Sequence, residues 1–212
     1  MNYEKVIIGN ATLYRGDCMD MLPLLPMAGT VVTDPPYPNN ANHFVDGIDA
    51  ARRFCAEYKA KHWLVFWTEV EIAPVPLPLV AVHIWHRSNT NRPDNYEPIF
   101  EFRSDGIKKA SRVMSYGVIA VGMTGVIASG HPTEKNPALM RELVARSTGL
   151  VIDPFMGSGT TGVAAMQMGR SFVGIEREQK YFDIACQRIE QAQKQADFFI
   201  APAVKQEQQP LI

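Results

Sequence analysis

The fold is decided by the stretch Leu150-Val151-Ile152-Asp153-Pro154-Phe155-Met156-Gly157-Ser158-Gly159-Thr160-Thr161-Gly162. Its apolar start, ending in an acid, predicts a buried strand that stops at Asp153. The glycines that follow allow a tight turn in which a ligand can approach the backbone closely. A helix through Met168 is expected next, and the free amides and positive dipole end of that helix face the same ligand. The stretch therefore predicts a strand, a ligand-binding turn and a helix.

The unit continues with a second strand and a second acid. Residues 171–175 are predicted to form a buried strand, and Glu176 follows it, 19 residues after Gly157. A carboxylate in this place can accept hydrogen bonds from both hydroxyls of a ribose. The glycines also satisfy the GxGxxG spacing of dinucleotide sites, so the unit indicates an adenosine-containing cofactor without deciding which one. Asp153 favours the amino group or sulfonium of S-adenosylmethionine, because an acid beside the turn repels phosphates.

Predicted strands and helices alternate along the rest of the chain. Strands are expected at 5–8, 12–14, 30–33, 62–67, 80–85 and 98–102, the last two as antiparallel neighbours. Helices are expected at 48–59, 137–147 and 178–195, with a short one capped by Asp17. This alternation predicts an α/β fold with a mostly parallel, doubly wound sheet, an antiparallel edge and helices on both faces. Ligands bind in such sheets at the carboxyl ends of the strands.

Size and composition fit one packed domain. The chain has 212 residues, of which 46% are hydrophobic and 20% charged. We expect a single domain over residues 1–200 and a flexible tail over 201–212. The sequence holds no apolar run of about 18 residues, so no membrane span is expected. The three cysteines share no CxxC spacing, which argues against a zinc site or disulfide framework and favours a reducing, cytoplasmic protein.

The stretch Asp34-Pro35-Pro36-Tyr37, after the predicted strand at 30–33, is the more specific signal. Its two prolines hold the Asp34 carboxylate, the Pro35 carbonyl and the Tyr37 ring in set directions. An aromatic amine such as adenine N6 is a poor nucleophile, because its lone pair is delocalised into the ring. Acceptors at Asp34 and Pro35 can draw the two amine hydrogens and free that lone pair, while Tyr37 stacks on an extruded base. The alternative is a plain Pro-Pro turn with Tyr37 in the core.

The two motifs together resemble the amino-methylating DNA methyltransferases of the β arrangement, in which the catalytic motif precedes the cofactor turn, and most of all a small orphan or phage-type member. The resemblance covers almost the whole chain. It implies a Rossmann-like, S-adenosylmethionine-dependent methyltransferase fold over the single domain. It also implies methyl transfer to adenine N6 of a flipped-out base in duplex DNA, with the catalytic residues Asp34, Pro35, Pro36 and Tyr37.

Other segments carry the same resemblance. Trp85–Arg87 and Asn95–Phe100 look like the family's middle strands, and Gly16-Asp17 before Cys18 looks like its adenine-contacting segment. His131–Lys135 resembles the segment that helps to hold the methionine carboxylate, although Asn136 stands where the family often has proline and could shift the next helix start. The cofactor-binding residues that the resemblance implies are Asp17, Cys18, His131, Thr133, Lys135, Asp153, Phe155, Gly157, Ser158, Gly159, Thr160, Thr161 and Glu176.

Residues 103–130 match no motif, and the resemblance implies a short target-recognition insertion there. A local basic cluster agrees with a role in DNA binding: Arg103, Lys108, Lys109 and Arg112, against Asp105. The net charge of -1 is unusual for a protein that binds DNA, and a solvated basic loop is the alternative interpretation of the cluster. The resemblance is compatible with a homodimer. No histidine or cysteine spacing indicates a metal site.

Several other functions stay open at this point. Asp34 favours adenine N6, whereas cytosine N4 enzymes of the family more often carry serine there. RNA and protein-glutamine methyltransferases usually place the cofactor motif first, which leaves RNA as a lesser alternative. An NAD-type oxidoreductase would share the sheet, but no proton-transfer pair is evident for a hydride step. A catalytically silent DNA-binding module is the remaining class.

Overall fold

A computed structural model describes residues 3–36, 45–67, 71–89, 95–117 and 135–200, with the side chains of 45–46 and 196–200 left out. A sheet of nine strands runs through them in the order β1-β2-β9-β8-β3-β4-β6-β5-β7. The strands are β1 (Glu4–Ile8), β2 (Ala11–Arg15), β3 (Ala28–Thr33), β4 (Ala60–Phe66), β5 (Leu79–His86), β6 (Tyr96–Arg103), β7 (Val113–Ser115), β8 (Val151–Asp153) and β9 (Phe172–Glu176).

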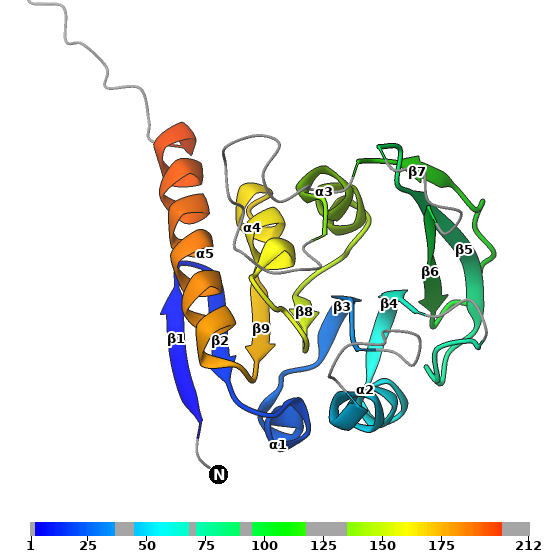
Figure 1. Ribbon diagram of the computed structural model, residues 1–212, viewed down its shortest axis with the longest axis horizontal. Helices are drawn as coiled ribbons and strands as arrows, with labels where there is room; N and C mark the ends of the chain where they lie inside the picture. Colours follow the sequence, from blue (N-terminus) through cyan, green and yellow to red (C-terminus); the bar gives the residue numbers. More distant parts are fainter. Residues whose placement is uncertain (1–2, 37–44, 68–70, 90–94, 118–134, 201–212) are drawn as a thin grey trace, which may run out of the picture.

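Helices cover both faces of this sheet (Figure 1). They are α1 (Cys18–Met21), the 3₁₀ turn η1 (Leu22–Leu24), α2 (Val45–Glu57), α3 (Pro137–Ala145), α4 (Thr160–Gln167) and α5 (Gln179–Ile200). Figure 1 shows α3, α4 and α5 on one side of the sheet and α1 and α2 on the other. None of the helices in the described part of the chain is both long and apolar enough to span a membrane.

The centre of the sheet is parallel and its edges contain antiparallel pairs. Parallel pairing joins β2 to β9, β9 to β8, β8 to β3 and β3 to β4. Antiparallel pairing joins β1 to β2 at one edge, and β6 to both β4 and β5 near the other. The predicted fold class is therefore confirmed.

Each face of the sheet buries its own apolar core. In β4 the alternation is visible, because Leu64 and Phe66 belong to the core under α3 to α5, whereas Trp63 and Val65 belong to the core under α1 and α2. All four are 1% exposed or less. Burying a side chain of this size stabilises a fold by about 1.5–3 kcal/mol, so β4 is a major source of stability on both faces.

Two local features differ from, or sharpen, the sequence-based expectations. Strand β7 was not predicted; it is three residues long and is defined by pairing with β5, from Ile84–Val113 to His86–Ser115. A strand of that length has too short a pattern to be recognised in a sequence. Asn136 does not disturb α3: its Oδ1 accepts from the amides of Ala138 (2.8 Å) and Leu139 (3.3 Å), so it caps a helix that begins at Pro137.

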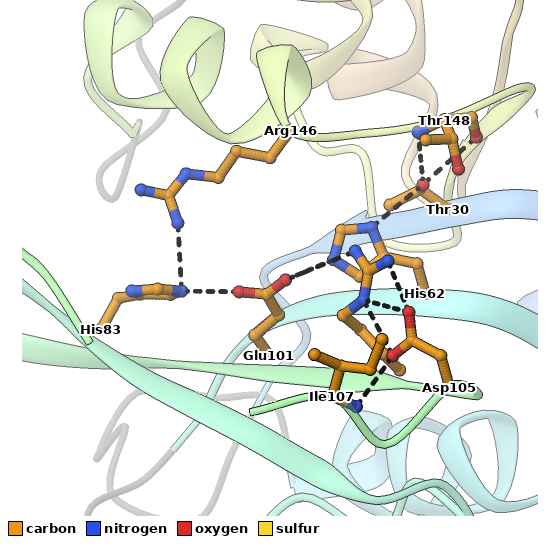
Figure 2. A network of polar contacts seen from close by, with 9 residues as sticks. Thr30, His62, His83, Glu101, Asp105, Ile107, Arg146 and Thr148 are labelled. Atoms are coloured by element: carbon orange, nitrogen blue, oxygen red, sulfur yellow. Dashed lines mark hydrogen bonds and ion pairs between the residues drawn. The ribbon is translucent and has the colours of Figure 1, made fainter. Parts of the chain in front are cut away.

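A buried polar network joins β4, β5 and β6 (Figure 2). One oxygen of the Glu101 carboxylate is hydrogen-bonded to His62 Nε2 at 3.0 Å. The other is hydrogen-bonded to His83 Nε2 at 2.9 Å. The Arg112 amide donates to His83 Nδ1, and Arg146 Nη1 lies 3.2 Å from His83 Nε2. Although burial alone would raise the pKa of Glu101, the bonds from both histidines lower it below its ordinary value. His62 of β4 is in register with Thr30, in the first half of β3, so the network lies toward the amino ends of the parallel strands.

Candidate active site

The predicted functional motifs meet at the opposite, carboxyl end of the parallel strands. Asp34 directly follows β3, Asp153 is the last residue of β8, and Glu176 is the last residue of β9. The Gly16 amide donates to the Glu176 carbonyl oxygen at 3.0 Å, which brings the segment before Asp17 to the same edge. The sequence-based expectation of a site at strand ends therefore agrees with the observed sheet order.

The two oxygens of Asp34 have different surroundings. Oδ2 lies 2.9 Å from Lys135 Nζ. Oδ1 is buried and has no hydrogen-bond partner among the described residues. Burial raises the pKa of Asp34 to about 6, with Glu97 adding to the rise and Lys135 and Arg87 opposing it. Asp34 thus presents one oxygen held by a cation and one acceptor that the described protein leaves unsatisfied.

Lys135 lies between two acids and two aromatic rings. Besides Asp34, its Nζ contacts Glu97 Oε1 at 3.1 Å and Oε2 at 3.2 Å. It also lies 4.8 Å from the centre of the Phe66 ring and 5.6 Å from that of Trp85, which stabilises the cation further. Burial would lower the pKa of Lys135, but the two acids raise it, so the ammonium form is the stable one.

Glu97 and Arg87 belong to this site, although the sequence indicates only that they lie in strand segments. The Glu97 side chain is 4% exposed, and Arg87 Nη2 donates to its Oε2 at 3.0 Å. The Arg87 guanidinium in turn lies 5.2 Å from the Trp85 ring. One signal could have indicated Glu97: it is an acid next to the apolar run Pro98-Ile99-Phe100, and an acid that is buried there needs a cationic partner.

The Gly-rich turn is tied to the neighbouring strand through Asp153. One Asp153 oxygen accepts from Thr33 Oγ1 (2.8 Å) and the Phe155 amide (3.1 Å), and the other accepts from Thr161 Oγ1 (2.6 Å). Burial raises the pKa of Asp153 to about 6, although these bonds oppose the rise. Asp153 therefore connects β3, the turn and the start of α4, in addition to any contact with a ligand.

The glycines of the turn serve backbone shape and packing. Gly157 and Gly159 have φ values of +51° and +82°, in the left-handed region that favours glycine. A Cβ on Gly159 would lie 2.9 Å from Ala185 Cβ, because α5 packs directly against the turn. Gly159 is also the N-cap residue of α4, so no side chain caps the first amides of that helix. The turn thus keeps backbone donors at a helix N-terminus.

Glu176 is the last residue of β9, and Asp17 immediately precedes α1. Burial raises the pKa of Glu176, against hydrogen bonds from the amides of Glu178 and Gly157. The Glu176 carboxylate is therefore beside the turn. Asp17 Oδ1 accepts from the Met19 amide at 2.8 Å and caps α1. The Cys18 side chain is only 4% exposed and packs in the core, where burial raises the pKa of its thiol to about 12.

Other predicted site residues lie elsewhere or outside the described residues. Tyr37, His131 and Thr133 are outside them, as are residues 118–130 of the proposed recognition insertion. Pro35 is buried, and Pro36 packs against Gly47 of α2. Within the described ranges, no group of histidine, cysteine and acidic side chains could hold a metal ion.

The predicted basic cluster does not adjoin Asp34. Because β6 runs antiparallel to β4, Arg103 pairs with His62, whereas Ile99 pairs with Phe66 at the carboxyl end of β4. Arg103 forms an ion pair with Asp105 at 2.8 Å, and Lys108 Nζ donates to the Leu79 carbonyl oxygen at 2.6 Å. Lys108, Lys109 and Arg112 are exposed, and the first two lie along the start of β5.

Parts of the chain are similar to known DNA methyltransferases. Residues 120–187 match the family described as DNA methylase, N6_N4_Mtase. The type II methyltransferase M2.DpnII of Streptococcus pneumoniae is 46% identical over 66 residues, which are 30% of this chain and 25% of that protein. The type II methyltransferase M2.LlaDCHI of Lactococcus lactis subsp. cremoris is 36% identical over 112 residues, 50% of this chain and 40% of that protein. The chain thus matches less than half the length of either curated relative.

Solved structures share the fold over most of the chain. The M1.HpyAVI–SAM complex aligns with a TM-score of 0.65 and 22% identity, covering 84% of this chain and 98% of that one. The cytosine-N4-specific PvuII DNA methyltransferase aligns with a TM-score of 0.66 and 17% identity, covering 92% of this chain and 95% of that one. The family match over residues 120–187 and the local identity to type II methyltransferases agree with the resemblance to amino-methylating DNA methyltransferases of the N6/N4 family, and the solved structures show that the fold is shared.

Proposed function

We propose that the protein transfers a methyl group from S-adenosylmethionine to the exocyclic amino group of a DNA base, adenine N6. The observation that carries the proposal is the Asp34 carboxylate at the carboxyl end of β3, with Oδ2 held by Lys135 and Oδ1 unsatisfied among the described residues. A buried acceptor without a donor costs about 1–3 kcal/mol, and a substrate N–H group that reaches it removes that cost.

The residues at the ends of β8 and β9 fit S-adenosylmethionine. Gly157 to Thr161 would hold it at the uncapped start of α4, where backbone amides suit a polar ligand. Glu176, beside Gly157, would accept hydrogen bonds from the ribose hydroxyls. Asp153, Asp34 and Glu176 make this edge acidic, which suits a cationic ligand better than a pyrophosphate. S-adenosylmethionine supplies a methyl group carried on a sulfonium.

The protein's own groups prepare the amine. Asp34 Oδ1 accepts one amine hydrogen, the Pro35 carbonyl accepts the other, and the nitrogen lone pair is then less delocalised into the ring. Lys135 holds Oδ2, so the carboxylate cannot rotate away from the amine. The raised pKa of Asp34, about 6, makes Oδ1 a base that can take up the proton the amine loses. No covalent bond between enzyme and base is needed.

Duplex DNA is the proposed substrate, with the target base flipped out of the stack. Two curated relatives are named type II methyltransferases, which supports DNA. Asp34 supports adenine, since the family's cytosine N4 enzymes more often carry serine there. Cytosine N4 is the second candidate, because the chain shares its fold with the cytosine-N4-specific PvuII enzyme. A homodimer stays a prediction of the family resemblance.

The test is methyl transfer from labelled S-adenosylmethionine to unmethylated duplex DNA, followed by digestion and mass spectrometry of the nucleosides. We expect N6-methyladenine. Detection of N4-methylcytosine would support the proposed transfer to an exocyclic amine and would show that the target base is cytosine. If no methylated nucleoside forms on DNA while the cofactor binds, the proposed function is wrong for DNA, and labelled RNA is the next substrate to assay.

A further inference from the structure

Four side chains of alternating charge, which we call the charge chain, contact one another in sequence and end at Asp34: Arg87, Glu97, Lys135 and Asp34. Arg87 donates to Glu97 at 3.0 Å, Glu97 contacts Lys135 at 3.1 Å and 3.2 Å, and Lys135 contacts Asp34 at 2.9 Å. The Glu97 and Lys135 side chains are the most enclosed, with 4% and 11% exposed, whereas Asp34 and Arg87 are each 25% exposed. The charges sum to zero, so the enclosed part of the chain carries no unbalanced ion.

We propose that Glu97 is a positioning residue for methyl transfer: it shares the Lys135 ammonium with Asp34 and so fixes which oxygen of Asp34 remains available to the target amine. The inference rests on the proposed function, because it names a further residue of the same site. Glu97 acts through Lys135, and no contact between Glu97 and a substrate is required.

The position of Lys135 needs both acids. Its Nζ is within 3.2 Å of three carboxylate oxygens, two from Glu97 and one from Asp34. An ammonium group has three hydrogens, so these contacts can use all of them. Without the two Glu97 oxygens, the long Lys135 side chain is free to move toward Asp34 and to occupy Oδ1 as well as Oδ2. The acceptor proposed for the amine would then be blocked.

A carboxylate is required at position 97 for a chemical reason. Glutamine keeps the shape but offers one oxygen and a donor NH₂ group. That NH₂ group would face the Lys135 ammonium in either orientation, and in one of them the Arg87 guanidinium as well; both cations are donors only. Glutamine therefore leaves one cation of the chain poorly paired in an enclosed place, where poor pairing of an ion is costly.

Glu97 also sets the basicity of Asp34. The charged groups around Asp34 are Lys135 before α3, Arg87 after β5, Glu97 on β6 and Asp153 at the end of β8. The negative charge of Glu97 raises the pKa of Asp34, and the positive charge of Lys135 lowers it. Removing Glu97 should therefore move the Asp34 pKa down from about 6, and removing Lys135 should move it up.

The experiment compares wild type with Glu97→Gln, Lys135→Met and Arg87→Gln. Single-turnover methyl transfer is followed from pH 5 to pH 9 with saturating S-adenosylmethionine and DNA. In parallel, the Asp34 carboxyl is titrated by ¹³C NMR in the cofactor-free protein. The control is Glu190→Gln, which removes an exposed acid paired with Lys194 on α5. Thermal unfolding checks that each variant is folded.

We expect Glu97→Gln to lower the rate at its pH plateau by roughly tenfold or more, the factor that corresponds to about 1.4 kcal/mol. The acid limb of its rate profile and the Asp34 titration should both move to lower pH, by about one unit. Lys135→Met should move the Asp34 titration to higher pH, and Arg87→Gln should move it in the same direction by less. Glu190→Gln should behave as wild type.

A rate decrease that is equal at all pH values, with the Asp34 titration unmoved in Glu97→Gln, would overturn the positioning role. If Glu97→Gln does not fold, the other two variants still test the proposal. The Asp34 titration must then move to higher pH in Lys135→Met and, by a smaller amount, in Arg87→Gln; titrations that do not move would overturn it. Absence of methyl transfer by wild type, with the expected NMR shifts intact, would instead refute the proposed function and keep the charge chain.

Discussion

Arg188 of α5 donates through Nη1 to both the backbone carbonyl oxygen of Ser158, at 2.8 Å, and its hydroxyl, at 2.9 Å. The same nitrogen lies 3.4 Å from Thr160 Oγ1. The Arg188 side chain of α5 therefore ties the Gly-rich turn to that helix. The turn's shape depends on this contact as well as on its own glycines.

We expect Arg188→Met to weaken S-adenosylmethionine binding by roughly tenfold, because a hydrogen bond from a charged group contributes about 1.5–3 kcal/mol and part of that holds the turn. Isothermal titration calorimetry measures the Kd. Lys194→Met, on the exposed side of the same helix, is the matched control. An unchanged Kd in Arg188→Met would mean that the turn keeps its shape without the hydrogen bonds from Arg188.

Substitutions at two glycines with positive φ can distinguish the cost of backbone strain from the cost of steric crowding. Gly159 (φ +82°) would place a Cβ 2.9 Å from Ala185, whereas Gly169 (φ +63°) has nothing within 4 Å of such a Cβ. Gly169→Ala should cost about 1–2 kcal/mol, from the left-handed conformation alone. Gly159→Ala should cost about 1–3 kcal/mol more, because α5 must also shift. Urea denaturation measures both, and equal destabilisation would show that α5 yields without cost.

The buried acid Glu101 should stabilise the fold in a pH-dependent way. Its pKa is lowered in the folded protein, so its contribution is full above its ordinary value of 4.5 and is lost progressively as pH falls from that value to the lower pKa of the folded state. Glu101→Gln should cost about 3 kcal/mol at pH 7, since it leaves two histidines without their carboxylate. The difference from wild type in urea denaturation should shrink toward pH 3. A difference that stays constant with pH would contradict the ionic role.

The sequence was sufficient for the parts of the site that are local in the chain. β3, β8 and β9 are apolar runs that end in an acid or lead into one. The prolines after β3 restrict the backbone, and the glycines after β8 permit the left-handed conformations of a tight turn. Short-range patterns of this kind predicted Asp34, the Gly-rich turn and Glu176 at one edge of the sheet. Chain order and sheet topology then brought them together.

The parts that were not predicted depend on pairing between distant strands. Glu97 reaches Lys135 because β6 runs antiparallel to β4 and β5, which places the start of β6 at the carboxyl end of the parallel strands. The same direction carries Arg103 to the opposite end, away from Asp34. Neither consequence can be derived from the local pattern of residues 95–112. The resemblance assigned Lys135 to a cofactor carboxylate, whereas in the structure it pairs with Asp34 and Glu97.

The basic cluster still makes a testable prediction about DNA. Lys108→Gln together with Lys109→Gln should weaken duplex binding and reduce the slope of log K against log salt by about 0.9 for each DNA phosphate that the protein no longer neutralises. Fluorescence anisotropy over a salt series measures this. Lys59→Gln with Lys194→Gln, two exposed lysines outside the cluster, gives a charge-matched control. Equal slopes for the two double variants would place the DNA surface elsewhere.

The measurement that tests the central claim most directly is single-turnover methyl transfer by Asp34→Ala, beside its Kd for S-adenosylmethionine. Asp34 is proposed to act on the amine through Oδ1, while the cofactor is held by the turn after β8 and by Glu176. We therefore expect cofactor binding within about threefold of wild type and no detectable methyl transfer, a decrease of at least about 10³-fold. Asp34→Ala with near-full turnover would contradict the assignment of the Asp34 carboxylate as the acceptor that activates the base.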